Sequence, residues 1–230
     1  MRKIKFFPDP IIEYDFKNVY RPSDDTYLVV DYFKYHLNSD FFDGIPLESI
    51  RNILDMGTGT GYIALSLQIM KTAIPKFNPN IYASDILEES IKLSKHNEKL
   101  NNFENQIHFI HSDLFDSFPK PLKHCFNIII FNPPYLPSIK LEKKEFDSSI
   151  DYSWDGGSEG FEVFLNFLDQ AKEFLKLNSK SYLYYLCSSR TNLKKLYHLI
   201  KNKGYKNKIL EKRHVFMEDI FLNKLEFVSS

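Results

Sequence analysis

Apolar residues recur along the chain with two alternating periods, one typical of strands and one of helices. Short apolar runs predict strands over residues 52–56, 81–84, 107–110, 126–131 and 182–187. Between them, apolar residues at helical spacing predict helices over residues 62–70, 87–100, 159–177 and 191–203. Strands that alternate with helices indicate an α/β protein, in which a parallel sheet is covered by helices on both faces.

The two ends of the chain depart from this alternation. A first helix is predicted to begin at Ser23, a residue that favours the N-cap position. Residues 11–16 alternate in a way that is typical of a short strand. Two strand-like runs, 208–215 and 219–228, close the chain and are long enough for an antiparallel hairpin at one edge of the sheet.

Composition and charge exclude several classes of protein. Lys plus Arg and Asp plus Glu both number 30, so the net charge is zero, which argues against a protein that depends on phosphate contacts. The longest uncharged run, residues 124–139, contains prolines and is shorter than the about 20 apolar residues of a membrane span. The N-terminus lacks the pattern of a signal peptide, and we expect a cytoplasmic protein. Cys125 and Cys187 are expected to be buried thiols, and no metal site is predicted.

A glycine-rich loop follows the first predicted strand. Gly57, Gly59 and Gly61 allow a tight turn and the close approach of a ligand. The pyrophosphate fingerprint G-x-G-x-x-G would need glycine at position 62, where Tyr62 stands. Asp55, just before the loop, would repel a phosphate and suits a ligand with an ammonium or sulfonium charge. The alternative is a glycine turn that binds no ligand.

Carboxylates end the next two predicted strands. Asp85 is placed to accept both hydroxyls of a ribose, as in nucleotide-binding folds. Its structural alternative is a helix N-cap for the residues that follow. Asp113 could accept an amino hydrogen of adenine, although aspartate after a strand is also common turn chemistry.

The fourth predicted strand ends in the tetrapeptide Asn132-Pro133-Pro134-Tyr135. The side-chain oxygen of Asn132 and the carbonyl of Pro133 form two acceptors on a stiff backbone, which can hold both hydrogens of a planar –NH2 group. Tyr135 can stack on that group. Prolines after a strand also simply end it, which is the structural alternative for Pro133 and Pro134.

Together these residues resemble the class I S-adenosylmethionine-dependent methyltransferases that modify an exocyclic or amide nitrogen. Residues 19–26 are similar to the Tyr-Glu-Pro…Asp-Thr segment of the small HemK-related enzymes of archaea and eukaryotes, with Arg21 where that family usually has glutamate. The segment Trp154-Asp155-Gly156-Gly157, followed by Gly160, resembles the active-site loop of the same family. We interpret it as a mobile loop beside the acceptor.

The resemblance implies a fold, a cofactor and a substrate. The fold is a Rossmann-like methyltransferase domain over residues 1–230, with a mostly parallel seven-stranded sheet, a C-terminal antiparallel hairpin and helices on both faces. Residues 1–40 are expected to pack over the cofactor site. The cofactor is S-adenosylmethionine, with S-adenosylhomocysteine as product. The substrate is the glutamine of the Gly-Gly-Gln motif in a class I translation release factor, and a small zinc-binding activator subunit is expected as partner.

The resemblance also assigns roles to individual residues. Cofactor contacts are implied for the methionine part at Thr26, Asp55, Gly57, Gly59 and Gly61, for the ribose at Asp85, and for the adenine at Asp113 and Leu114, with Asn132 adjoining. The acceptor amide is assigned to Asn132, Pro133, Pro134 and Tyr135.

Two alternatives belong to other classes of protein. An adenine or guanine amino-methyltransferase could hold a flipped base with the same tetrapeptide, but the zero net charge and the lack of room for a recognition domain disfavour it. A cofactor-binding but inactive partner subunit is disfavoured by the intact tetrapeptide.

Overall fold

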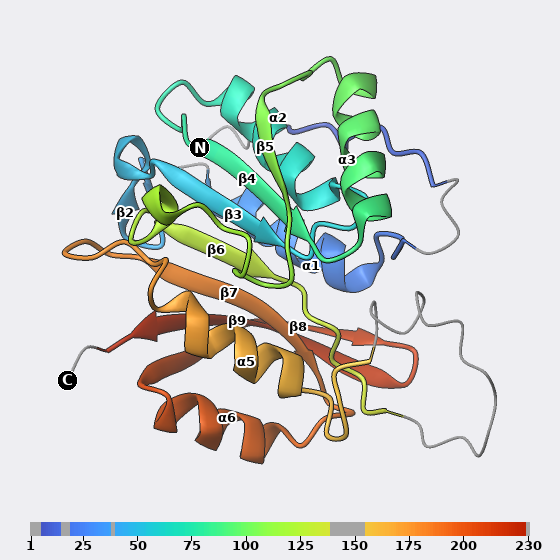
Figure 1. Ribbon diagram of the computed structural model, residues 1–230, viewed down its shortest axis with the longest axis vertical. Coiled ribbons are helices and arrows are strands. Elements are labelled where there is room, and N and C mark those ends of the chain that lie inside the picture. The colour runs from blue at the N-terminus through green and yellow to red at the C-terminus, as the bar shows by residue number, and fades with distance from the viewer. Residues whose placement is uncertain (1–5, 15–18, 38–39, 139–154, 229–230) are drawn as a thin grey trace.

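The computed structural model of the chain describes residues 6–14, 19–37, 40–138 and 155–228. Seven strands form one mixed sheet in the order β5-β4-β3-β6-β7-β9-β8 (Figure 1). The strands of this sheet are β3 (Asn52–Met56), β4 (Asn80–Asp85), β5 (Ile107–His111), β6 (Ile128–Phe131), β7 (Tyr182–Ser188), β8 (Tyr205–Val215) and β9 (Glu218–Phe227). Pairing is parallel from β5 to β7, and β9 runs antiparallel to β7 and β8. The predicted mostly parallel sheet with a C-terminal hairpin is confirmed.

Helices cover the sheet from both faces. The α-helices are α1 (Asp24–His36), α2 (Tyr62–Ala73), α3 (Glu88–Leu100), α5 (Glu162–Ala171) and α6 (Leu193–Asn202). Short elements complete the described chain, namely β1 (Phe41–Phe42), β2 (Ile45–Pro46) and the 3-10 turns η1 (Leu47–Ser49) and η2 (Lys120–Leu122). The described helices are at most 13 residues long, and none of them could span a membrane.

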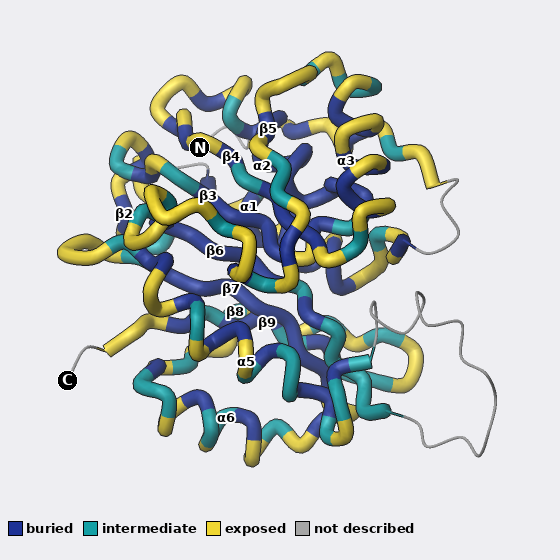
Figure 2. The backbone as a smooth tube through the Cα atoms, viewed as in Figure 1, coloured by how far each residue is buried: buried dark blue, intermediate teal, exposed yellow. Residues whose placement is uncertain are grey.

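The central strands are buried on both faces because successive side chains point to opposite sides of the sheet. Ile128 and Ile130 of β6 join the apolar cluster that contains α1 and α2, whereas Ile129 and Phe131 join the cluster that contains α5 and α6. Figure 2 shows β3, β6 and β7 as the most continuously buried part of the backbone. The continuous apolar run of the fourth predicted strand is thus explained by two helical layers.

Two sequence predictions about elements are wrong. The helix predicted over 159–177 is the shorter α5, because the chain leaves the helix after Ala171 and pairs Leu175 with Phe126 in an isolated parallel bridge. The alternation over 11–16 does not form a strand at residues 11–14, and the rest of that run lies outside the described residues. There the backbone is held by α3, because the Asn101 side chain bonds both the amide and the carbonyl of Ile11.

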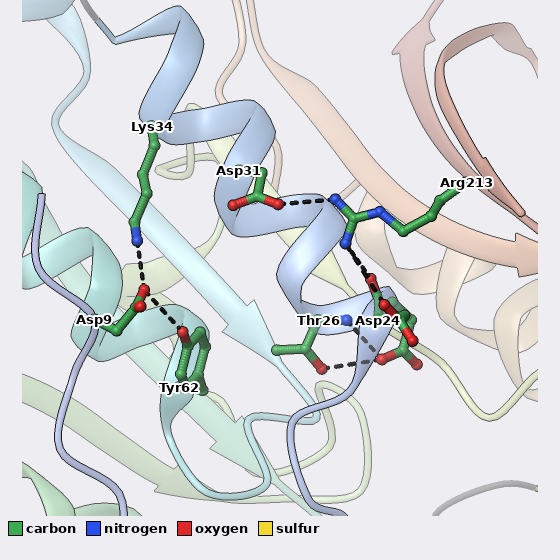
Figure 3. A network of polar contacts seen from close by, with 8 residues as sticks. Asp9, Asp24, Thr26, Asp31, Lys34, Tyr62 and Arg213 are labelled. Atoms are coloured by element: carbon green, nitrogen blue, oxygen red, sulfur yellow. Dashed lines mark hydrogen bonds and ion pairs between the residues drawn. The ribbon is translucent and has the colours of Figure 1, made fainter. Parts of the chain in front are cut away.

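Helix α1 is tethered on two sides by polar contacts (Figure 3). Lys34 donates to Asp9 at 2.6 Å, and the same carboxylate accepts from the Tyr62 hydroxyl of α2 at 3.1 Å. On the other side, Arg213 of β8 donates to Asp31 at 2.8 Å. These contacts fix the C-terminal half of α1 relative to both α2 and the C-terminal hairpin.

A buried polar cluster lies at the turn between β1 and β2. The Asp43 carboxylate accepts hydrogen bonds from Tyr184 at 2.7 Å, Tyr32 at 2.8 Å and Lys224 at 3.0 Å, and so joins β7, α1 and β9. Burial alone would raise the pKa of Asp43, but these three donors outweigh it and hold the pKa below its usual value. The cluster stabilises the fold in its ionised form.

Replacing Asp43 with Asn should lower the free energy of unfolding by roughly 1.5–3 kcal/mol at pH 7, because hydrogen bonds to a charged group are lost. Since the folded pKa is lowered, this contribution is present above the usual carboxylate pKa near 4 and disappears as the pH falls below it. Urea denaturation at pH 7 and pH 3 measures both effects. The control is Glu104→Gln, which removes an exposed ion pair with Lys99 and should change the free energy of unfolding little. An equal loss of stability in both variants would contradict the stabilising role of Asp43.

Candidate active site

A cavity of about 730 Å³ opens at the C-terminal ends of β3, β4, β5 and β6. Its wall contains residues that directly follow each of these strands, including Gly57, Ile86, Ser112 and Asn132. The volume is in the range of small-molecule sites, and this edge of a parallel sheet is where ligands bind in open α/β folds. Helix α1 supplies another part of the wall through its first turn.

The glycine loop between β3 and α2 forms the floor of the cavity. Gly57 and Gly59 line it, and both have positive φ angles, +66° and +54°. A Cβ atom at Gly57 would lie 3.2 Å from the Phe131 ring, so the loop depends on glycine for space as well as for conformation. Gly61 does not line the cavity; its φ of +84° starts α2, and its Cα packs against Ser94 of α3.

Helix α3 and the end of β4 hold the loop in place through side chains that are themselves buried. Asp85 accepts from the Gly59 amide at 2.9 Å with one oxygen and from the Leu87 amide at 2.9 Å with the other. Ser94 donates to the Gly59 carbonyl at 2.8 Å, and Asn97 donates to the Thr60 carbonyl at 3.0 Å. Burial raises the pKa of Asp85, against the effect of its backbone hydrogen bonds. The sequence also allowed Asp85 to act as a helix N-cap. Its bond to the Leu87 amide fits that role only in part, because α3 begins at Glu88 and Asp85 also binds the Gly59 amide of the loop.

Asp55 lies behind the glycine loop and does not line the cavity. One carboxylate oxygen accepts from the Thr58 hydroxyl at 2.7 Å and the Ala64 amide at 3.2 Å. The other oxygen is buried and has no hydrogen-bond partner in the described structure. Burial raises the pKa of Asp55 to about 7, because removal from water disfavours the ionised carboxylate.

Asp25, in the first turn of α1, accepts hydrogen bonds from three side chains at the acceptor end of the cavity. One of its oxygens receives the Tyr20 hydroxyl at 2.9 Å, the Tyr135 hydroxyl at 3.0 Å and the Asn132 Nδ2 at 3.0 Å. The other receives the Thr26 amide at 2.6 Å. Asp25 is only 2% exposed, so these contacts are protected from water.

The contact with Asp25 sets the orientation of the Asn132 amide. A carboxylate accepts hydrogen bonds and does not donate them, so Asn132 must turn its NH2 group toward Asp25. The Asn132 Oδ1 atom then points away, is buried and has no hydrogen-bond partner in the described structure. Because Asn132 lines the cavity, this oxygen is an acceptor that a ligand –NH2 group can satisfy.

The second glycine cluster packs directly on the tetrapeptide. A Cβ atom at Gly156 would lie 2.6 Å from the Pro134 carbonyl oxygen, and one at Gly160 would lie 2.6 Å from the Tyr135 carbonyl oxygen. The Gly156 amide also donates to the Leu136 carbonyl at 2.9 Å. Only residues without a side chain allow this backbone contact. Mobility of this loop stays a prediction, and Trp154 lies outside the described residues.

The described lining of the cavity carries negative charge only. Its ionisable acids are Asp24, Asp25, Asp85, Asp113, Asp116, Asp155, Asp169 and Glu218, and the described lining includes no Lys, Arg or His. Such a cavity attracts ammonium and sulfonium groups and repels phosphates. In the described part of the chain, no group of three or more His, Cys, Asp or Glu residues is arranged to hold a metal ion.

Most residues singled out in the sequence meet at this cavity. It is lined by Thr26, Gly57, Gly59, Asp85, Asp113, Leu114, Asn132, Pro133, Pro134 and Tyr135, whereas Asp55 and Gly61 stand behind it. Sequence reasoning missed the function of Asp25 and of the Tyr20 hydroxyl, although both belong to the segment that carries the family resemblance. Arg21 lies over the Tyr14 ring at 5.6 Å and does not line the cavity.

Comparisons with known proteins agree with this site. A family model described as "Methyltransferase small domain" matches residues 41–150. A Methanocaldococcus jannaschii protein named for protein N5-glutamine methyltransferase activity is 31% identical over 204 residues, which cover 89% of each chain. The chain belongs to the protein N5-glutamine methyltransferases. Members of this family are S-adenosylmethionine-dependent enzymes.

The share of a relative's own length that matches this methyltransferase differs from one relative to another. The Schizosaccharomyces pombe eRF1 methyltransferase catalytic subunit is 26% identical over 83% of this chain and 81% of its own. The Rickettsia prowazekii bifunctional methyltransferase is 32% identical, and only 33% of its length is matched. The structure of the E. cuniculi Mtq2–Trm112 complex, which is responsible for the methylation of eRF1, shares the fold with a TM-score of 0.61 at 22% identity, covering 91% of this chain and 99% of that one.

The cavity of the methyltransferase fits its cofactor. Gly57 and Gly59 place backbone without side chains in the cavity wall, and the charged side chains of the described lining are all carboxylates. Asn132, which lines the same cavity, has a buried side-chain oxygen without a hydrogen-bond partner in the described structure.

Replacing Asp55 with Asn should change how the stability of the free enzyme depends on pH. Because the folded pKa is raised to about 7, the contribution of Asp55 to the wild-type free energy of unfolding is most favourable below the usual carboxylate pKa and falls as the pH rises toward 7, by roughly 4 kcal/mol. The variant has no such carboxylate and should lack this fall. Urea denaturation between pH 4.5 and 8 measures the profile.

Asp113→Asn, which removes an exposed carboxylate at the same edge of the sheet, serves as the matched control. This control should keep the wild-type pH profile. An Asp55→Asn profile that follows the wild type would show that Asp55 is not the group responsible.

Proposed function

We propose that this enzyme methylates the side-chain amide nitrogen of a glutamine in the Gly-Gly-Gln motif of a class I translation release factor. The observation that carries the proposal is the buried Asn132 Oδ1 atom, an acceptor without a partner on a residue that lines the cavity and is oriented by Asp25. The names of the relatives support the same substrate, because the S. pombe relative is an eRF1 methyltransferase subunit and a Lactococcus lactis relative is a release factor glutamine methyltransferase.

The chemical problem is that an amide nitrogen is a poor nucleophile, since its lone pair is delocalised into the carbonyl group. Asn132 Oδ1 and the Pro133 carbonyl accept the two amide hydrogens, which draws electron density onto nitrogen and directs its lone pair. When bound, S-adenosylmethionine would supply an electrophilic methyl group and would leave as the neutral thioether, and the amide nitrogen would lose one proton to water. Orientation of this kind can supply about 7–11 kcal/mol.

The remaining site residues divide between cofactor and acceptor. Asp85 is assigned to the ribose, Asp113 and Leu114 to the adenine, and the loop at Gly57 to the methionine part. Thr26 is assigned to the methionine carboxylate, which agrees with the prediction that residues 1–40 pack over the cofactor, since α1 contributes to the cavity wall. Tyr135 has its hydroxyl fixed by Asp25, so its ring is available to pack against the acceptor amide.

A small partner subunit belongs to the same proposal. The S. pombe relative is named a catalytic subunit, and the E. cuniculi structure is a complex of two proteins. We infer that this chain likewise assembles with a small activator and that the activator binds zinc, as the family resemblance implies. A protein that is soluble, monomeric and fully active alone would refute this. Action on a release factor also places the enzyme in the cytoplasm, with translation.

The nucleic-acid alternative is disfavoured by the charge of the site. A flipped base would bring its phosphates to the mouth of the cavity, where the described ionisable lining is acidic throughout. A glutamine side chain carries no charge and meets no such repulsion.

The proposal predicts one added methyl group on a release factor that carries the Gly-Gly-Gln motif, after incubation with enzyme, partner and S-adenosylmethionine. Intact-mass analysis, followed by peptide mapping to the glutamine, checks it. A release factor with Gln replaced by Ala at the motif should gain no mass. An unmodified wild-type release factor, or methylation of an RNA or DNA oligonucleotide in its place, would refute the proposed substrate.

Replacing Asn132 with Ala should lower methyl transfer by at least about 10²–10³-fold, because one acceptor for the reacting amide is lost. Binding of S-adenosylhomocysteine, measured by calorimetry, should persist. Full residual activity would remove Asn132 from the catalytic site.

Replacing Asp25 with Asn should lower kcat by roughly 10- to 100-fold. The new NH2 group would face hydrogen-bond donors that point at a carboxylate in the wild-type enzyme. The neighbouring Asp24, whose side chain is 51% exposed, provides the matched control Asp24→Asn. The control should retain near wild-type kcat. Equal effects of the two substitutions would argue that Asp25 acts only through charge.

A further inference from the structure

We propose that the turn of the β8–β9 hairpin, made of Phe216 and Met217, is a docking contact for the protein that carries the acceptor amide. This inference rests on the proposed function, because it assumes a protein substrate. It adds a contact outside the cavity and names its occupant, a translation release factor.

The first observation is the exposure of two adjacent apolar side chains. Phe216 is 91% exposed and Met217 is 72% exposed. Figure 2 shows the turn between β8 and β9 as an exposed end of a hairpin whose strands lead into the buried sheet. Aromatic residues and methionine are enriched in protein interfaces, where their burial supplies much of the binding energy.

The second observation is the backbone of the turn. Phe216 has a φ angle of +37° at the first position of a two-residue hairpin turn. Such positions favour glycine, asparagine or aspartate, and a bulky residue there is strained. Met217 has no positive φ, so the turn has the pattern that prefers glycine at its first position, and folding alone would be better served by glycine in place of Phe216. The exposed Phe-Met pair therefore has a use other than closing the hairpin.

The third observation is where the turn lies. Val215 and Glu218, the residues on either side of it, both line the cavity, as does Ile220. Ile220 pairs with Ser188 at the C-terminal end of β7, so the turn stands at the same edge of the sheet as the active site. A glutamine side chain is short, so a substrate that places its amide at Asn132 must bring its own backbone to the mouth of this cavity. The turn is continuous with that mouth.

The turn is also held firmly, which lowers the entropy cost of using it for binding. Asp219 pairs across the hairpin with Lys212 at 2.8 Å and with His214 at 2.9 Å. The Ser189 amide donates to the Asp219 carbonyl at 2.8 Å, which fixes the hairpin to the end of β7. Arg213 joins the hairpin to α1 through Asp31.

The test is the double variant Phe216→Gly/Met217→Asn, which removes both apolar side chains and installs a turn sequence with glycine at the position of positive φ. The thermal midpoint should stay equal or rise, and S-adenosylhomocysteine binding should not change. The Kd for a release factor with the Gly-Gly-Gln motif, measured in the presence of S-adenosylhomocysteine, should rise about 10- to 100-fold. In methylation assays KM should rise while kcat changes little.

The matched control is Leu177→Asn, which removes a 55% exposed apolar side chain before the start of β7, at the opposite end of the sheet. It should leave Kd and KM unchanged. A wild-type enzyme that binds the release factor without methylating it would refute the proposed function while the docking contact stands.

Several results would overturn the docking contact itself. One is failure of the wild-type enzyme to bind the release factor, and another is a Kd of the double variant within twofold of the wild-type value. A fall in the thermal midpoint of the double variant would show that the fold needs Phe216. Loss of a co-purifying small subunit, or a change from dimer to monomer, would assign the turn to another occupant and overturn it as well.

Discussion

A carboxylate that is shut away from water requires hydrogen-bond donors, and the active site is organised around the one at Asp25. Its donors come from parts of the chain that are far apart: Tyr20 precedes α1, whereas Asn132 and Tyr135 follow β6. Satisfying this one group brings the N-terminal segment against the acceptor tetrapeptide. It also decides which face of the Asn132 amide is turned to the ligand, so a requirement of folding sets the chemistry of the site.

The position of Asp25 depends in turn on contacts outside the cavity. Helix α1 is joined to α2 through Asp9 and to the C-terminal hairpin through Arg213, and it reaches the Asp43 cluster through Tyr32. The tetrapeptide is supported from the opposite side by Gly156 and Gly160, whose backbones touch its carbonyls. The acceptor site is thus held between two supports that belong to different layers of the fold.

Much of this could be predicted from the sequence, because apolar periodicity reports burial and parallel strands end at a common edge. That is why Asp85, Asp113 and Asn132 were expected together. Asp25 could not be assigned by the same logic: within its own helix it is only a favourable first-turn acid, and its donors Asn132 and Tyr135 lie 107 and 110 residues away. The true ends of α5 were equally hidden, because the bridge between Phe126 and Leu175 depends on tertiary contacts.

The acidic lining has a consequence for the direction of turnover. Methyl transfer turns a sulfonium into a neutral thioether, so one positive charge disappears from within a wall whose described charged side chains are all carboxylates. The electrostatic attraction that favours loading is therefore weaker once the reaction is complete. A cavity of this kind distinguishes a fresh cofactor from a spent one by charge, with no change of shape, and so favours exchange of the spent molecule after each cycle.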